Sequence, residues 1–333
     1  MLILGARDVR QALDGREREV LAAVREAYVR HARGESAIPH SVFLRFPEDE
    51  RNRIIGLPAY LGGERPVAGM KWISSFPGNL ELGLERASAA IILNSMRTGH
   101  PEALIEGSLV SARRTAASAA LAAATLAGEQ PDTGAALIGC GVINFEVLRF
   151  LRVVLPALDT VTLYDRDGSR AEEFAARCAR EQPGLKTAVV DRPEDAMAAH
   201  PLVALATTAA APHLDTAPCR PGTLVLHVSL RDLTVESVLS AVNVVDDPDH
   251  VCRAATSLHL AEQESGDREF ISATIGGLLA GPSPRPRDPR RITVFSPFGL
   301  GILDLALADL VRRGAEAGGG GTRLDGFLPG GAP

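Results

Sequence analysis

Two glycines after an apolar run are the clearest sign of chemistry in this sequence. Gly139 and Gly141 directly follow Ala135–Ile138, and Asp165 follows a second apolar run, 24 residues after Gly141 (165 − 141). Such glycines permit a tight turn in which backbone N–H groups approach a pyrophosphate, and an acid about 20 residues later accepts hydrogen bonds from a ribose. The pattern predicts a dinucleotide site, and the alternative is a tight turn without a ligand.

The residues around this turn bear on the choice of dinucleotide. A carboxylate at Asp165 repels a 2′-phosphate and therefore favours NAD over NADP, although Arg166 beside it weakens that preference. Asn144 stands where a third glycine normally allows close packing of helix and strand, so its side chain must be accommodated there.

Several cations occur in or beside predicted strands, and they could bind carboxylates. They are Arg45, Lys71, Arg113, Arg114 and Arg231. Each of them taken alone could equally be a solvated surface charge. Their shared position near strand ends favours a site for an anionic substrate.

Two roles are open to Asp232, which follows the predicted strand Thr223–Val228. It could move protons for a substrate amine or water, or it could be the N-cap of a helix that begins at Leu233-Thr234. His227 lies within the same apolar strand, which favours a core histidine over a catalytic one. The spacing of the histidines and of the four cysteines predicts neither a metal site nor a disulfide framework.

The elements that must position these residues alternate in type through the middle of the chain. Strands are predicted at 135–138, 160–164, 187–190, 202–206, 223–228 and 242–245, with helices at 144–154 and 169–180. Alternation of this kind predicts a Rossmann-type doubly wound parallel sheet. The first third combines helical periodicity over 8–31 with strand-like runs between 41 and 107, and a helix is predicted from Thr115 to Ala127, directly after Arg113 and Arg114.

These elements predict an α/β fold in which the Rossmann domain is inserted into a discontinuous α+β domain. The expected boundaries are 1–113 with 297–320 for the discontinuous domain, 114–296 for the Rossmann domain, and a disordered tail over 321–333.

Composition narrows the classes of partner. The net charge is −6 and the basic residues are scattered, so no nucleic-acid partner is expected. The longest apolar stretches are too short and too rich in alanine to span a bilayer, so no membrane partner is expected either. The N-terminus lacks a secretory signal pattern, and we expect a cytoplasmic protein.

Several motifs resemble the ornithine cyclodeaminase/mu-crystallin family. They are Gly69-Met70-Lys71, Pro77-Gly78-Asn79, Thr98–Ile105, Ser111–Ala117, Gly139–Asn144 and Ser296–Gly299 followed by Asp304. The resemblance runs over nearly the whole chain. It implies a Rossmann domain that binds NAD, a second domain that holds the substrate and forms a homodimer, and hydride transfer at the Cα of an amino acid.

The resemblance also implies roles for individual residues. It makes Asp232 and Lys71 catalytic, and it places Arg45, Lys71, Arg114 and Pro297 at the substrate, with Arg114 also near the dinucleotide. The implied dinucleotide contacts are Arg114, Thr115, Gly139, Gly141, Val142, Ile143, Asp165, Thr207, Ser229 and Ser296.

Two departures from ornithine cyclodeaminases refine the expected activity. The segment His227–Asp232 is shortened, and Arg86 replaces a small hydroxyl residue. Arg86 and Arg231 add charge that suits a small amino-acid substrate with several carboxylates. Three segments, Gly83–Ser88, Ile138–Gly141 and Phe295–Gly299, look most like the branch that makes 2,3-diaminopropionate for siderophores or peptide antibiotics.

That branch resemblance implies NAD-dependent oxidative hydrolysis of N-((2S)-2-amino-2-carboxyethyl)-L-glutamate to 2-oxoglutarate and L-2,3-diaminopropionate. The alternatives are an ornithine cyclodeaminase, an alanine dehydrogenase or a ketimine reductase of the same family. A non-enzymatic, crystallin-like protein that binds the dinucleotide without turnover is a further alternative.

Overall fold

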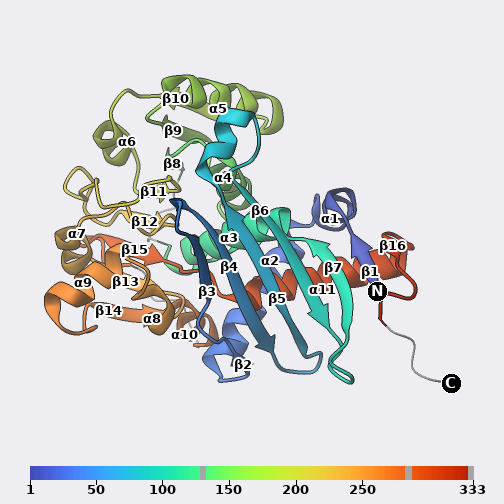
Figure 1. Ribbon diagram of the computed structural model, residues 1–333. Helices are drawn as coiled ribbons and strands as arrows, with labels where there is room; N and C mark the ends of the chain where they lie inside the picture. The colour runs from blue at the N-terminus through green and yellow to red at the C-terminus, as the bar shows by residue number, and fades with distance from the viewer. Residues whose placement is uncertain (128–132, 282–286, 329–333) are drawn as a thin grey trace. The chain divides into compact units, whose positions relative to one another are not determined.

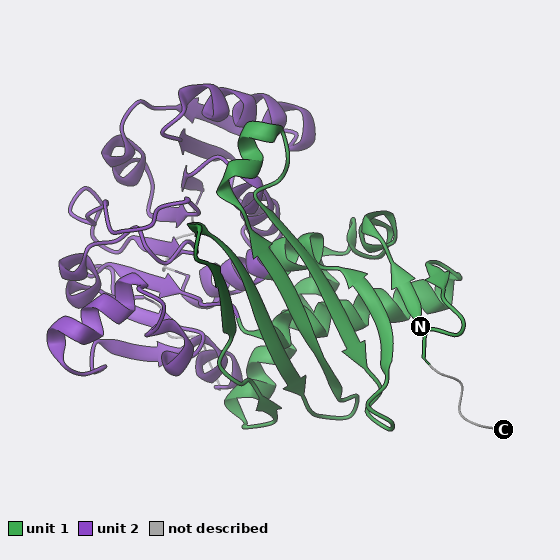
Figure 2. Ribbon diagram, in the orientation of Figure 1, with its two compact units in different colours: residues 1–114, 300–333 green, residues 115–299 purple. Residues whose placement is uncertain are grey.

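The computed structural model describes residues 1–127, 133–281 and 287–328, and its chain forms two compact units (Figures 1 and 2). Unit 1 comprises residues 1–114 and 300–333, and unit 2 comprises residues 115–299. The domain boundaries predicted from the sequence lay between residues 113 and 114 and between residues 296 and 297, close to the boundaries of these units. Among the described helices, none is long and apolar enough to cross a membrane.

Unit 1 is built on a mixed eight-stranded sheet in the order β16-β1-β7-β6-β5-β4-β2, with β3 paired to β4. Its strands are β1 (Leu2–Leu4), β2 (Ser36–Ala37), β3 (Val42–Phe46), β4 (Asp49–Leu61), β5 (Val67–Ser75), β6 (Ala87–Asn94), β7 (Pro101–Glu106) and β16 (Thr322–Arg323). Strands β3 to β7 pair antiparallel in chain order, because hairpin turns join them.

The helix α11 (Gly301–Gly318) packs on this sheet and on α2 (Glu17–Ala32), beside α1 (Ala6–Leu13). The approach to β5 is close, because a Cβ at Gly69 would lie 3.2 Å from a Leu305 methyl carbon and 2.1 Å from the Ile92 carbonyl oxygen. Side chains alternate between the faces of a strand. Lys71 is therefore buried, while its neighbour Trp72 is 43% exposed on the opposite face.

The helix predicted from Thr115 begins eight residues earlier, since α3 spans Gly107–Thr125. The carboxylate of Glu106, the last residue of β7, accepts hydrogen bonds from Ser108 N at 2.6 Å and Leu109 N at 3.0 Å. These bonds satisfy amides that the first helical turn leaves free. Arg113 and Arg114 consequently lie inside the helix, and the expectation that they precede it was wrong.

The C-terminal segment is more ordered than predicted. A disordered tail was expected over 321–333, but Thr322 and Arg323 pair antiparallel with Ile3 and Leu2. Gly321, with φ +80°, makes the turn that leads into this strand. Residues 329–333 of the predicted tail lie outside the described residues.

Unit 2 contains the predicted doubly wound sheet, and every neighbouring pair of its strands is parallel. The order is β10-β9-β8-β11-β12-β15-β13-β14. The strands are β8 (Gly134–Ile138), β9 (Thr160–Tyr164), β10 (Lys186–Val189), β11 (Leu202–Leu205), β12 (Leu224–His227), β13 (Val242–Val245), β14 (Ile271–Thr274) and β15 (Thr293–Ser296). The chain order reverses between β8 and β11, which is the switch point where such sheets bind ligands.

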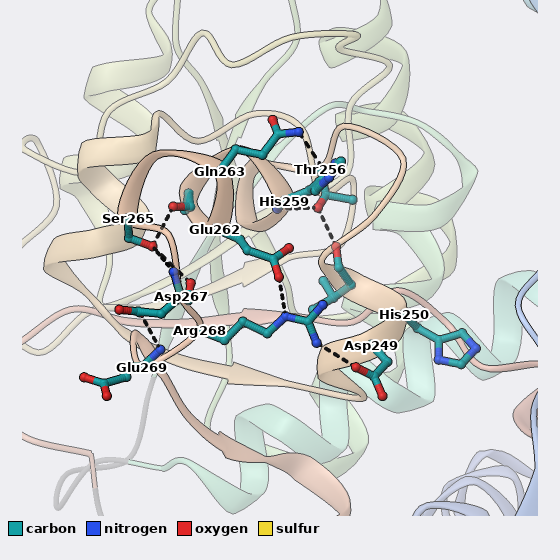
Figure 3. Close-up of polar contacts among 12 residues, drawn as sticks. Asp249, His250, Thr256, His259, Glu262, Gln263, Ser265, Asp267, Arg268 and Glu269 are labelled. Carbon is teal, nitrogen blue, oxygen red and sulfur yellow. Dashed lines mark hydrogen bonds and ion pairs between the residues drawn. The ribbon is translucent and has the colours of Figure 1, made fainter.

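The helices of unit 2 connect these strands. They are α4 (Val142–Val154), α5 (Gly168–Glu181), α6 (Pro193–Ala199), α7 (Val235–Ser240), α8 (Pro248–Val251), α9 (Ser257–Ser265) and α10 (Ile275–Ala280). The edge strand β14 was not predicted. It follows a loop in which Arg268 donates to Glu262 and to Asp249, each at 2.6 Å, and so links the loop to α9 and α8 (Figure 3).

Candidate active site

The glycine turn of unit 2 has the backbone geometry that a dinucleotide requires. Gly139 has φ +91°, and a Cβ there would lie 2.5 Å from the Ala206 carbonyl oxygen, so no other residue fits without a shift. Gly141 is the N-cap of α4 and forms no side-chain cap. The N–H groups of Val142 and Ile143 in the first turn therefore lack intrahelical partners, and such groups bind anions.

Asp165 follows β9 beside this turn. Its Oδ2 accepts a hydrogen bond from Cys140 N at 2.8 Å, and its Oδ1 accepts one from Asp167 N at 3.0 Å. The carboxylate is thereby fixed next to the glycines and retains lone pairs for ribose hydroxyls. Arg170 Nε is 3.9 Å from Asp165 Oδ2, whereas Arg166 is exposed.

Asn144 occupies the position of the third glycine, and hydrogen bonds accommodate its side chain there. Its buried Nδ2 donates to the carbonyl oxygens of Ile138 at 2.9 Å and Gly139 at 2.8 Å. The amide thus ties α4 to the end of β8, where a glycine would have allowed close contact. These residues fit a bound dinucleotide.

Asp232 lies at the centre of a buried polar cluster in unit 2. Thr207 Oγ1 donates to its Oδ1 and Ser229 Oγ donates to its Oδ2. His227 Nε2 lies 3.4 Å from Oδ2 and accepts a hydrogen bond from Asp232 N at 3.1 Å. His227 Nδ1 lies 3.2 Å from Ser296 Oγ. The histidine is therefore a satisfied core residue and also a direct neighbour of the carboxylate.

Asp232 is held in its ionised form. Burial acts to raise the pKa of this carboxyl, but the adjacent imidazole of His227, with hydrogen bonds from the hydroxyls of Ser229 and Thr207, holds it below its usual value. The N-cap alternative was wrong, because Thr234 caps α7 by accepting a hydrogen bond from Ser237 N. The segment before Asp232 turns at Leu230, whose φ of +68° is a left-handed conformation that is costly for a residue other than glycine.

A second cluster lies in unit 1, where one buried carboxylate holds two cations. Lys71 Nζ donates to Asp304 Oδ2 at 2.7 Å, and Arg114 Nε donates to Asp304 Oδ1 at 3.0 Å. Ser111 Oγ accepts from both cations, at 3.2 Å from Lys71 and 3.3 Å from Arg114. The charges sum to +1 when Lys71 is protonated. A buried site of this charge is suited to a further carboxylate.

The environment of Lys71 also changes its acidity. Burial, helped by the charge of Arg114, lowers the pKa of Lys71 from 10.5 to about 8, although Asp304 opposes the change. The amine can therefore bind an anion at neutral pH and can lose its proton slightly above it. Neither Ser111 nor Asp304 was predicted as a site residue. The signal for Asp304 was an acid within the apolar run Ile302–Leu307.

The remaining predicted residues lie outside these two clusters. Arg45 on β3 is exposed and lies over the Phe43 ring, and Arg86 precedes β6 and is half-buried. Among the described residues, neither forms an ion pair or hydrogen bond with the Lys71 cluster. Arg231 Nη2 donates to the Ala254 carbonyl oxygen at 2.7 Å, so part of its guanidinium is engaged within unit 2.

The last predicted residues lie near the ends of their elements. Thr115 is half-buried on α3, and Pro297 is buried directly after β15. The backbone beyond Pro297 is fixed because Phe298 N and Gly299 N donate to the buried Asp246 at 2.9 and 2.7 Å. Within the described ranges, no group of three or more His, Cys, Asp or Glu side chains could hold a metal ion.

Comparison with known proteins identifies the family. The model of the ornithine cyclodeaminase/mu-crystallin family matches residues 2–319. The chain belongs to this family. An N-((2S)-2-amino-2-carboxyethyl)-L-glutamate dehydrogenase of Staphylococcus aureus is 29% identical over 333 residues, which cover 98% of each chain.

Solved structures agree with this assignment. A Δ1-pyrroline-2-carboxylate reductase of Thermococcus litoralis, in complex with NADH and L-proline, superposes with a TM-score of 0.90 at 27% identity, covering 97% of this chain and 100% of the other. An archaeal alanine dehydrogenase dimer with bound NAD has a TM-score of 0.86 at 29% identity, covering 98% and 99%. Both structures therefore share the fold of this chain over nearly its whole length.

Proposed function

We propose that the chain is an NAD-dependent dehydrogenase that cleaves a secondary amine of an amino acid. Its substrate is N-((2S)-2-amino-2-carboxyethyl)-L-glutamate, and its products are 2-oxoglutarate, L-2,3-diaminopropionate and NADH. The observation that carries the proposal is the buried cluster of Lys71 and Arg114 on Asp304, whose net positive charge suits a carboxylate next to the reacting carbon. The similarity to the Staphylococcus aureus enzyme over 98% of the chain supports this substrate.

The dinucleotide is held by the glycine turn in this proposal. The N–H groups of Val142 and Ile143 bind the pyrophosphate, and Asp165 accepts hydrogen bonds from the adenosine ribose. The nicotinamide supplies a hydride acceptor. Since the Asp165 carboxylate is anionic and fixed by Cys140 N, it disfavours a 2′-phosphate, and NAD is the preferred cofactor.

The side chains of both clusters take part in the reaction. Lys71 and Arg114 bind the α-carboxylate of the glutamate half, and its Cα loses a hydride as the C–N bond is oxidised to an imine. Asp232 accepts the amine proton and orients the water that adds to the imine carbon. Hydrolysis then breaks the C–N bond, so the oxygen of water enters 2-oxoglutarate and the nitrogen leaves with 2,3-diaminopropionate.

The contacts of Asp232 support its role as a base. A carboxylate that stays ionised at neutral pH can accept a proton, while His227, Thr207 and Ser229 keep it in one orientation. We also propose that the chain acts as a homodimer, as the archaeal alanine dehydrogenase does. The diaminopropionate it forms would serve siderophore or peptide-antibiotic synthesis.

Mass spectrometry of product mixtures tests this function. With NAD+ and the glutamate conjugate, we expect NADH, 2-oxoglutarate and 2,3-diaminopropionate in equal amounts. Parallel reactions contain ornithine with NAD+, alanine with NAD+, or Δ1-pyrroline-2-carboxylate with NADH. Each of these reactions should show little turnover. Proline and ammonia from ornithine, with no products from the conjugate, would mean that the chain is a cyclodeaminase.

A further inference from the structure

Three arginines lie side by side at one end of the sheet in unit 1. Arg45 on β3 is directly opposite Arg53 on β4, and Arg53 is opposite Ser75 on β5. Ser75 in turn is opposite Ala87, the first residue of β6, and Arg86 precedes it. Arg86 is joined to β5 by a hydrogen bond from Phe76 N to its carbonyl oxygen at 2.8 Å. We name Arg45, Arg53 and Arg86 the arginine row.

Arg53, the middle residue of the arginine row, lies on the same face of the sheet as Lys71. Arg53 and Leu57 are four residues apart on β4, and Leu57 is opposite Lys71 on β5. Because alternate residues of a strand share a face, the side chains of Arg53 and Lys71 emerge on one side. Four residues correspond to about 14 Å along the strand. Side chains of this length can approach two carboxylates of one ligand that are several bonds apart.

The arginine row has no carboxylate partner among the side chains that the structure describes. Like charges directly opposite one another destabilise a sheet. No carboxylate among the described residues forms an ion pair with Arg45, Arg53 or Arg86. By contrast Arg51, two residues before Arg53, donates to Asp49 at 3.2 and 3.3 Å.

The half-buried guanidinium groups are desolvated as well as unpaired. Burial, followed by the charge of Arg45, lowers the pKa of Arg53, and burial, followed by the charge of Arg53, lowers that of Arg86. An anion bound between them would relieve both effects.

A buried hydroxyl beside Arg53 is a second, independent sign of a missing ligand. Ser75 Oγ is buried and forms no hydrogen bond to a described residue, although it lies directly across the sheet from Arg53. The great majority of buried side-chain polar atoms in folded proteins are hydrogen-bonded. A carboxylate held by Arg53 could accept a hydrogen bond from the Ser75 hydroxyl.

We propose that Arg53, with Arg45 and Arg86 on either side and the Ser75 hydroxyl, binds the γ-carboxylate of the glutamate half of the substrate. This subsite selects substrates whose oxidised half carries a side-chain carboxylate in addition to its α-carboxylate. The inference rests on the proposed function in that Lys71 and Arg114 bind the first carboxylate. It makes Arg53 a specificity-determining residue.

The test compares Arg53→Leu with the control Arg51→Leu. The control also removes a guanidinium group from β4, but one whose charge Asp49 already neutralises. For the glutamate conjugate, Arg53→Leu should raise KM roughly 10- to 100-fold, as expected for loss of a charged hydrogen bond. For N-(2-amino-2-carboxyethyl)-L-alanine, which lacks only the γ-carboxylate of the glutamate half, KM should change less than about threefold. Equal losses on both substrates, or no loss on either, would overturn the proposal.

A binding measurement separates this inference from the proposed reaction. Glutarate should raise the Tm of the wild-type protein, and of Arg51→Leu, more than acetate does, and Arg53→Leu should abolish that difference. Without ligand, Arg53→Leu should keep or raise the wild-type Tm, because it removes a like-charge pair.

A ligand-free Tm that falls by several degrees would mean that Arg53 is structural and would overturn the inference. If the wild type fails to oxidise the glutamate conjugate but the glutarate effect depends on Arg53, the proposed function fails and the subsite stands. If the conjugate is oxidised and Arg53→Leu changes neither KM nor the glutarate effect, the function stands and the subsite is wrong.

Discussion

Replacement of Asp304 by asparagine should be among the most damaging conservative changes in unit 1. The side chain is fully buried and accepts two charge-assisted hydrogen bonds, at 2.7 Å from Lys71 and 3.0 Å from Arg114. Removal of one partner from a buried ion pair costs about 3–5 kcal/mol, because the remaining charge is left uncompensated. Two hydrogen bonds at about 1.5–3 kcal/mol each give a similar sum. Urea unfolding at pH 7 should show this loss in the free energy of unfolding.

Two further variants show whether charge is the cause. Asp309→Asn changes the same helix at a carboxylate that pairs with Arg312 and Arg313 nearer the surface, so we expect a loss below about 1 kcal/mol. The double variant Lys71→Met/Asp304→Asn also removes one of the two uncompensated cations, and should be more stable than Asp304→Asn alone. A loss below about 1 kcal/mol for Asp304→Asn, or a double variant that loses the sum of both single changes, would refute the reasoning.

Three other predictions concern the cofactor, the base and the lysine. Asp165→Ser should narrow the preference for NAD+ over NADP+ by about 1–3 kcal/mol in calorimetric titrations, and equal affinities in the wild type would contradict it. Asp232→Asn should leave NAD+ binding intact and lower kcat by about 10²–10⁴-fold, and near-normal turnover would remove Asp232 from the mechanism. Because the pKa of Lys71 is about 8, kcat/KM should fall as the pH rises through about 8, when the neutral amine no longer attracts a carboxylate. Relative to Lys71→Met, stability should rise between pH 8 and 10.5, since the unfolded chain then keeps a proton that the folded chain has lost.

Local sequence patterns predicted the sheet of unit 2 well. The strands at 160–164 and 242–245 were predicted with the bounds that the structure has, because each is a short β-rich run bordered by turn or helix signals. The start of α3 was missed, because no Ser, Thr, Asn or Asp precedes Gly107 and a glutamate from the previous strand caps the helix instead. The strand β14 was missed because Ile271–Thr274 is short, has a single large apolar residue and runs directly into α10; among the described strands its partner is β13.

In the candidate site too, local sequence patterns predicted some features and missed others. Arg113 and Arg114 are neighbours of the same type; both were possible carboxylate binders from the sequence, and only the family resemblance favoured Arg114. On the helix their side chains diverge: Arg113 donates to Asp14 at 2.6 Å, whereas Arg114 donates to Asp304. Successive helical residues point about 100° apart, but nothing local states which direction faces a carboxylate.

The sequence by itself determined the glycine turn, the acid that follows β9 and the alternation of strands and helices, because these depend on neighbouring residues and on backbone freedom at glycine. Only the tertiary structure decided which charges meet. Lys71 and Asp304 are 233 residues apart in the chain, and the packing of α11 on β5 brings them to 2.7 Å. The pKa of Lys71 and the lack of a carboxylate partner for the arginine row among the described residues follow from such contacts. They depend on distance and burial in space, which residue order does not encode locally.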